Sequence, residues 1–82
     1  MKVYIIRYED LCNNDYSSGV MYAFDSLEKA EIMLEEIKKD EISSSEREDF
    51  KDLIRDLISE KGFIIDYIDD YTKYIIKEME VK

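Results

Sequence analysis

Residues 25–37 read DSLEKAEIMLEEI, a stretch that has both the start signal and the apolar spacing of a helix. Asp25 stands three residues before Glu28, a carboxylate version of the capping box that begins helices. The apolar residues that follow recur at helical spacing: Leu27, Ala30, Met33, Leu34 and Ile37. The pattern predicts a helix over residues 26–40.

Two strands are predicted before this helix. Residues 3–9 are rich in β-branched and aromatic side chains, and residues 20–24 have a similar composition. Between them, residues 11–19 are rich in Asn, Ser, Asp and Gly, which bond their own backbone or accept positive φ, so we expect a loop. The simplest arrangement is an antiparallel hairpin with an unusually long connection.

A second helix is predicted after the serine turn at residues 43–45. Ser45 and Glu48 form a capping box. Five apolar residues then follow at the spacing of one helical face: Phe50, Leu53, Ile54, Leu57 and Ile58. Gly62 favours the left-handed conformation that ends helices, so this helix is expected to end at Lys61.

Two further strands, over residues 63–69 and 74–81, flank a turn at residues 69–73. The predicted order is therefore β-β-α-α-β-β. Strand pairs at both ends with helices between them favour an α+β fold: one mainly antiparallel sheet of four strands with two helices packed on one face. With 82 residues, of which 45% are hydrophobic, the chain is expected to form a single domain over residues 1–82.

The charge balance restricts the partners. The chain has 21 acidic and 12 basic residues, a net charge of -9. Such a chain repels phosphates, so we expect neither direct nucleic-acid binding nor adsorption to an anionic membrane, and a basic protein or nucleoprotein complex is the natural complement. The single Cys12, the lack of a signal peptide and the lack of a long apolar run favour a cytoplasmic protein, or one in the host cytoplasm if phage-encoded.

The second predicted helix carries a row of carboxylates. The row comprises Glu48, Asp52, Asp56 and Glu60, at successive i, i+4 positions. Like charges at this spacing destabilise a helix by a few tenths of a kcal/mol per pair, roughly. One hypothesis is that the row meets a basic groove, as a mimic of the DNA phosphate backbone would. The alternative is a solvated face that only maintains solubility.

Tyrosines mark a second candidate surface. Both faces of the predicted strands are apolar, and the face that is rich in tyrosine includes Tyr4, Tyr8 and Tyr67. If the helices cover the other face, this one is expected to contact a second copy in a homodimer or another protein. The alternative is that the rings lie flat on the open sheet and stabilise it through cross-strand pairs.

No catalytic, cofactor or metal site is expected. The chain has no histidine, no Gly-rich phosphate loop and no CxxC motif, and Cys12 has no cationic neighbour in sequence that would activate it. Asp66, Asp69 and Asp70 are the one close carboxylate cluster in a turn, which could hold a hard cation. Asp residues that form the turn's own hydrogen bonds are the favoured alternative.

Three segments carry a resemblance to known proteins: residues 2–4 (KVY), 24–30 (FDSLEKA) and 74–80 (YIIKEME). With them the chain resembles small uncharacterised bacterial and phage proteins that run strand, strand, helix, strand, over most of its length except the second predicted helix. In size and acidity it is similar to phage-encoded inhibitors of host defence, including anti-CRISPR proteins. The resemblance implies no catalytic residue, and it implies blockage of a nucleic-acid channel or a subunit interface.

The leading hypothesis from the sequence is a non-catalytic inhibitor that docks on a basic surface of a nucleic-acid-handling complex of the defence or CRISPR type. The alternatives are a homo-oligomeric structural or regulatory protein that uses the sheet face, and a carboxylate-metal hydrolase.

Overall fold

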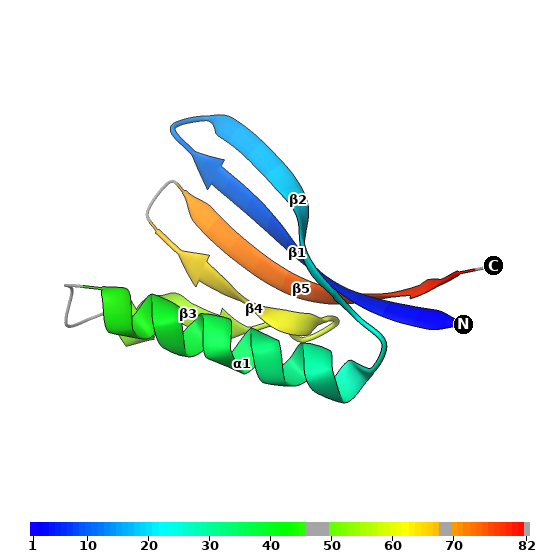
Figure 1. The fold of residues 1–82 in the computed structure, drawn as a ribbon. Coiled ribbons are helices and arrows are strands. Elements are labelled where there is room, and N and C mark those ends of the chain that lie inside the picture. Colours follow the sequence, from blue (N-terminus) through cyan, green and yellow to red (C-terminus); the bar gives the residue numbers. More distant parts are fainter. Residues whose placement is uncertain (46–49, 68–69, 82) are drawn as a thin grey trace.

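The computed structural model describes residues 1–45, 50–67 and 70–81, which form a five-stranded antiparallel sheet with one α-helix (Figure 1). The strand order is β2-β1-β5-β4-β3. The elements are β1 (Lys2–Cys12), β2 (Asp15–Phe24), α1 (Leu27–Ser44), the 3₁₀-helix η1 (Phe50–Leu53), β3 (Ile54–Asp56), β4 (Lys61–Asp66) and β5 (Tyr71–Glu80).

The prediction of four strands and two helices is wrong. The segment expected to form the second helix instead contains η1 and the short strand β3, which pairs antiparallel with β4. Leu53 and Ile54 pack against the core, whereas Ile58, expected on the same helical face, is fully exposed. Pairing with β4 thus outweighs the local helical pattern. The proposed capping residue Glu48 lies outside the described residues.

The connection between β1 and β2 is a tight turn and not a long loop. Only Asn13 and Asn14 separate the paired residues Cys12 and Asp15. Both asparagines have positive φ, 53° and 67°, which is the signature of a type I′ hairpin turn. The serines and the glycine assigned to a loop therefore belong to β2, which lengthens both strands.

The helix α1 confirms the first helical prediction and extends it to Ser44. Its N-cap is Ser26, whose Oγ accepts a hydrogen bond from the backbone N–H of Lys29 at 3.2 Å. Asp25, expected to begin the helix, instead forms an ion pair with the Lys29 side chain at 2.9 Å. The cap is therefore one residue later than the capping pattern predicts.

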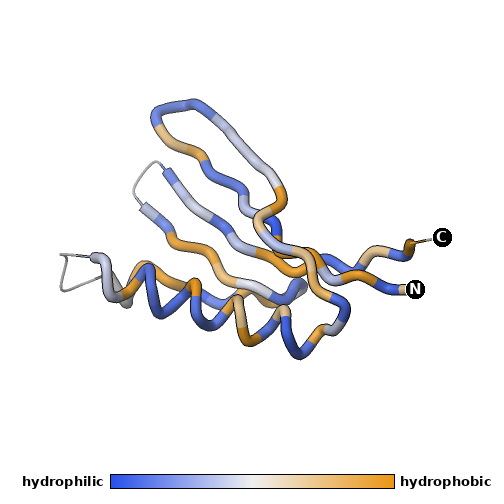
Figure 2. The backbone as a smooth tube through the Cα atoms, viewed as in Figure 1, coloured by the Kyte–Doolittle hydropathy of each residue, from blue (hydrophilic) through white to orange (hydrophobic). Residues whose placement is uncertain are grey.

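The core lies between α1 and one face of the sheet. Figure 2 shows apolar colour concentrated along the parts of β1, β4 and β5 that pass over the helix. The buried cluster comprises Ala30, Leu34 and Ile37 of α1 with Ile6, Phe63, Ile65, Tyr74 and Ile76 of the sheet. The strand partners Ile6 and Ile76, and Phe63 and Tyr74, stand side by side on this face.

Gly62 lies inside β4, so its expected role as a helix stop is wrong. A Cβ atom at this position would collide with the Tyr74 carbonyl oxygen and would stand 2.9 Å from Cα of Ile75. The glycine is needed because the backbones of β4 and β5 approach closely here.

No helix among the described residues has both the length and the apolar character needed to cross a lipid bilayer.

Candidate protein-binding surfaces

The predicted carboxylate row is not a row in the structure. Asp52 lies in η1, Asp56 in β3 and Glu60 in the bend before β4, while Glu48 lies outside the described residues. Asp56 forms an ion pair with Lys38 at 3.1 Å, and Glu60 one with Lys73 at 3.6 Å. Without a second helix, nothing spaces these carboxylates as a phosphate backbone would.

The three predicted tyrosines do not form one open surface either. Tyr4 and Tyr8 lie on the same face of β1 as Ile6, so they pack against the core on the helix side. Tyr67 follows β4, 38% exposed, and its backbone N–H donates to the carbonyl of Asp70. The face of the sheet away from the helix has Ile5 and Ile75 buried in it, and the strand register places Tyr16 and Tyr71 there, beside Leu11.

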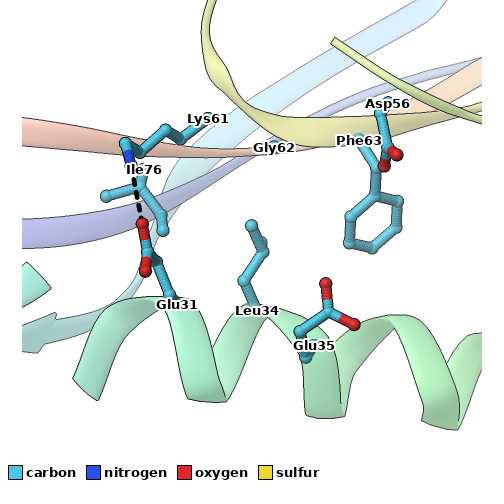
Figure 3. Close-up of a pocket in the computed structure, with 8 residues that line it drawn as sticks. All are labelled: Glu31, Leu34, Glu35, Asp56, Lys61, Gly62, Phe63 and Ile76. Atoms are coloured by element: carbon cyan, nitrogen blue, oxygen red, sulfur yellow. Dashed lines mark hydrogen bonds and ion pairs between the residues drawn. The ribbon is translucent and has the colours of Figure 1, made fainter. Parts of the chain in front are cut away.

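A pocket with an acidic rim opens between α1 and the β3–β4 hairpin (Figure 3). Its volume is about 360 Å³. The lining residues are Glu31, Leu34, Glu35, Asp56, Lys61, Gly62, Phe63 and Ile76. Leu34, Phe63 and Ile76 belong to the buried core, so the pocket has an apolar floor and three carboxylates above it.

Ion pairs occupy the two ends of this pocket. At one end Lys61 Nζ lies 2.6 Å from Glu31 Oε1. At the other end Lys38 Nζ lies 3.1 Å from Asp56 Oδ1 and 5.8 Å from the centre of the Phe63 ring. The cations of these two pairs are therefore already engaged by carboxylates of the same chain.

Glu35 lies between these two ends, one helical turn after Glu31 and just before Lys38. It is exposed, and it has no ion pair with any residue in the described parts of the chain. Figure 3 shows its carboxylate pointing into the space beside Phe63. The pocket thus offers one unneutralised carboxylate above an apolar floor.

An aromatic pair holds the floor in place. The rings of Phe63 and Tyr74 are neighbours on β4 and β5, with centroids 5.2 Å apart. The Tyr74 hydroxyl donates to Glu41 Oε1 of α1 at 3.0 Å, which ties the sheet to the helix. Burial, and then the negative charge of Glu41, raise the pKa of Tyr74 well above its usual range.

The two described carboxylates of the cluster bind residues of other segments, and not the backbone of their own turn as the favoured alternative expects. Asp66 forms an ion pair with Arg55, and Asp70 Oδ1 accepts the backbone N–H of Asn13 at 3.2 Å. Asp69 lies outside the described residues. Within the described ranges no group of three His, Cys, Asp or Glu side chains is placed to hold a metal ion, and Cys12 is a free, exposed thiol.

Sequence reasoning missed the pocket because its residues are far apart in the chain. Glu31, Glu35 and Lys38 were not singled out on the first predicted helix, and Asp56 and Lys61 were assigned to a second helix where the structure has β3 and β4. A signal was present: Glu31, Glu35 and Lys38 fall at the edge of the apolar stripe that includes Leu34. Side chains at such an edge border whatever the helix packs against.

Comparison with protein-family models, with curated proteins and with solved structures finds no match to this chain.

Proposed function

We propose that this chain is a non-catalytic inhibitor that docks on a basic surface of a nucleic-acid-handling complex. The observation that carries the proposal is the acidic pocket, where Glu35, which has no ion pair among the described residues, stands above the apolar floor formed by Leu34 and Phe63. The proposal does not rest on mimicry of a phosphate backbone, since the three described carboxylates expected for that role, Asp52, Asp56 and Glu60, do not lie on one helix.

The pocket suits a lysine or arginine side chain of a partner protein. These side chains combine a long apolar stem with a cationic head. The stem would lie on the apolar floor, and the head would reach Glu35 between the two existing ion pairs. The net charge of -9 favours the approach of a basic partner over an acidic one.

Complexes that handle nucleic acids present such basic surfaces because they neutralise phosphates with lysine and arginine. A small domain seated on that surface excludes the nucleic acid without doing chemistry. The similarity in size and acidity to phage-encoded anti-CRISPR proteins favours a defence complex as the target, met in the cytoplasm of the host.

The experiment is affinity capture of the full chain from bacterial cytoplasm, followed by calorimetric measurement of the Kd for the captured protein. The deciding comparison is between Glu35→Lys and Glu36→Lys. Both residues are exposed neighbours on α1 and both substitutions change the charge equally, but only Glu35 lines the pocket. We expect Glu35→Lys to raise the Kd at least about tenfold and Glu36→Lys to raise it far less.

Equal effects of the two substitutions would show that only net charge matters and would remove the pocket from the proposal. An acidic partner, or a captured complex that still binds its nucleic acid in the presence of the chain, would refute the inhibitor function itself.

A further inference from the structure

Strand β2 forms one edge of the sheet and carries almost no charge. It pairs with β1 on one side and with no other strand in the described ranges (Figure 1). Residues 16–24 contain no charged side chain, although 40% of the chain is charged, and no other uncharged run in the sequence is as long. The exposed edge is therefore the least charged part of the chain.

The opposite edge of the same sheet is protected in the usual ways. Strand β3 has three residues, two of which are Arg55 and Asp56. Short edge strands with charged side chains prevent sheets from pairing edge to edge. By contrast β2 has ten residues, and its exposed side chains include Tyr16 (58%) and Val20 (54%). A bulge opposite the Ile6–Arg7 step limits the regular edge to residues 15–20.

The turn determines which residues of β2 direct their backbone N–H and C=O groups outward. Cys12 and Asp15 close a two-residue turn, and in such a hairpin the closing pair is hydrogen-bonded across the two strands. Because hydrogen-bonded and non-hydrogen-bonded pairs alternate, Tyr16, Ser18 and Val20 direct their N–H and C=O groups away from β1. These three residues also share one face of the strand.

We propose that two copies of this chain pair through β2, antiparallel and related by a two-fold axis at Ser18, so that the two sheets become one. In this register Ser18 faces Ser18 of the other copy, and Tyr16 of each copy faces Val20 of the other. All the outward backbone groups of the regular edge then find partners.

The side chains favour a second copy over an unrelated strand, because the strand is complementary to itself. The two-fold axis places Tyr16 and Val20 on the same face, where aromatic and β-branched residues form favourable cross-strand pairs. No like charges stand opposite each other. The two Asp15 carboxylates are six residues apart along the seam, about 20 Å, which exceeds the screening length of about 8 Å in physiological salt.

This interface goes beyond the proposed function and is separate from it. The pocket lies between α1 and the β3–β4 hairpin, and none of its lining residues belongs to β2. Glu35→Lys should therefore leave self-association intact, and substitutions in β2 should leave the pocket intact. Failure of one proposal can thus be recognised without failure of the other.

The first test is sedimentation of the full chain from micromolar to millimolar concentration. We expect the mass to rise from 9.8 kDa toward twice that value. Val20→Lys places a lysine on the edge and should raise the dimer Kd at least about tenfold. Its control is Ile32→Lys, which makes the same charge change at a side chain of α1 that is equally exposed (56%) and should not raise the Kd.

A monomer over the whole concentration range would overturn the proposal and leave a strand of another protein as the occupant of this edge. Dimers weakened equally by Val20→Lys and Ile32→Lys would also overturn it.

The second test fixes the register by cross-linking, in a Cys12→Ser background that removes the native thiol. With Ser18→Cys the two Cα atoms stand about 5.5 Å apart, within disulfide range, so oxidation should give a covalent dimer. With Ser17→Cys the corresponding atoms stand diagonally, at about 7–8 Å, and should not cross-link efficiently. Faster cross-linking of Ser17→Cys than of Ser18→Cys would refute the two-fold axis at Ser18.

Discussion

Tyr74 joins the apolar core to the polar rim of the molecule. Its ring packs beside Phe63, and its hydroxyl reaches Glu41 on α1. Because the buried phenol is hard to ionise next to a carboxylate, the pKa of Tyr74 is raised in the folded protein. A tyrosine in the unfolded chain has a pKa of about 10.

We predict from this difference that Tyr74 destabilises the fold at alkaline pH. Below about pH 10 the phenol is protonated in both states, and the contribution of Tyr74 to the free energy of unfolding is fully present. As the pH rises above that value, the unfolded chain loses the proton first. The free energy of unfolding therefore falls with increasing pH, until the pH reaches the raised pKa of the folded state. Urea unfolding followed by circular dichroism from pH 8 to pH 11 measures the slope.

Tyr74→Phe isolates this effect from other groups that titrate in the same range. At neutral pH the variant should be less stable by about 1 kcal/mol, because Glu41 loses its donor. Above about pH 10 the gap should shrink, since phenylalanine does not ionise. A gap that stays constant up to pH 11 would contradict the raised pKa.

Single residues also explain why the predicted tyrosine surface failed. Tyr4 and Tyr8 were rightly placed on one face of β1, because alternation along a strand is fixed by geometry. Which face the helix covers is decided by packing, and here the larger tyrosine and Ile6 side chains meet the helix. The sequence contains the alternation but not the choice between faces.

At the scale of elements, the contact between β4 and β5 depends on one glycine. We predict that Gly62→Ala destabilises the protein by about 3 kcal/mol, because the added methyl group meets the backbone at Tyr74 and Ile75, which cannot move without separating the strands. Thermal unfolding followed by circular dichroism measures the loss.

Gly19→Ala is the matched control for this prediction. The three atoms nearest to a Cβ atom at Gly19 all belong to the Tyr8 side chain, with Cε1 at 3.0 Å, and a side chain at a partly exposed position can shift. Its cost should stay below about 1 kcal/mol. Equal losses from the two substitutions would mean that β4 and β5 are not as closely apposed as described.

Local pattern predicted the helix α1 and four of the five strands, and it failed in the segment that follows α1. The strands β1, β2, β4 and β5 and the helix α1 were all recognised, with shifted boundaries. The segment from Phe50 to Ile58 has helical spacing, yet Ile54 to Asp56 form a strand that extends the sheet beside β4. The gain from pairing with an existing strand is a long-range effect, which a local periodicity does not contain.

The antiparallel hairpin of β1 and β2 was predicted correctly, but its long connection was wrong for a different reason. Asn, Ser and Gly residues were all taken as loop formers, but a type I′ turn needs only the two asparagines. The remaining small residues then fall on an edge strand, where one neighbouring strand is enough to hold them. The acidic pocket was missed because a second helix was predicted: Asp56 and Lys61 reach α1 only when β3 and β4 form a hairpin.

At the scale of the whole molecule, charge is the dominant property. The chain carries a net charge of -9 within a radius of gyration of 13.4 Å. Ion pairs such as Lys61 with Glu31 neutralise some carboxylates, whereas Glu35 has no ion pair among the described residues. An excess of one charge confined to this volume opposes folding, because the charges lie farther apart in the unfolded chain.

We therefore predict that salt stabilises the fold. Raising the ionic strength from about 0.01 M to 0.15 M shortens the screening length from about 30 Å to about 8 Å, from well above the radius of the molecule to below it. The net repulsion should weaken more than the exposed ion pairs, which contribute only about 0–1 kcal/mol each. The midpoint of urea unfolding, in a denaturant that adds no ions, should rise across this range.

Glu36→Gln removes one exposed carboxylate, so it should raise the midpoint at low salt and flatten its dependence on salt. A midpoint that falls as salt is added would mean that attraction between paired charges, and not the excess of carboxylates, governs the electrostatics of this fold.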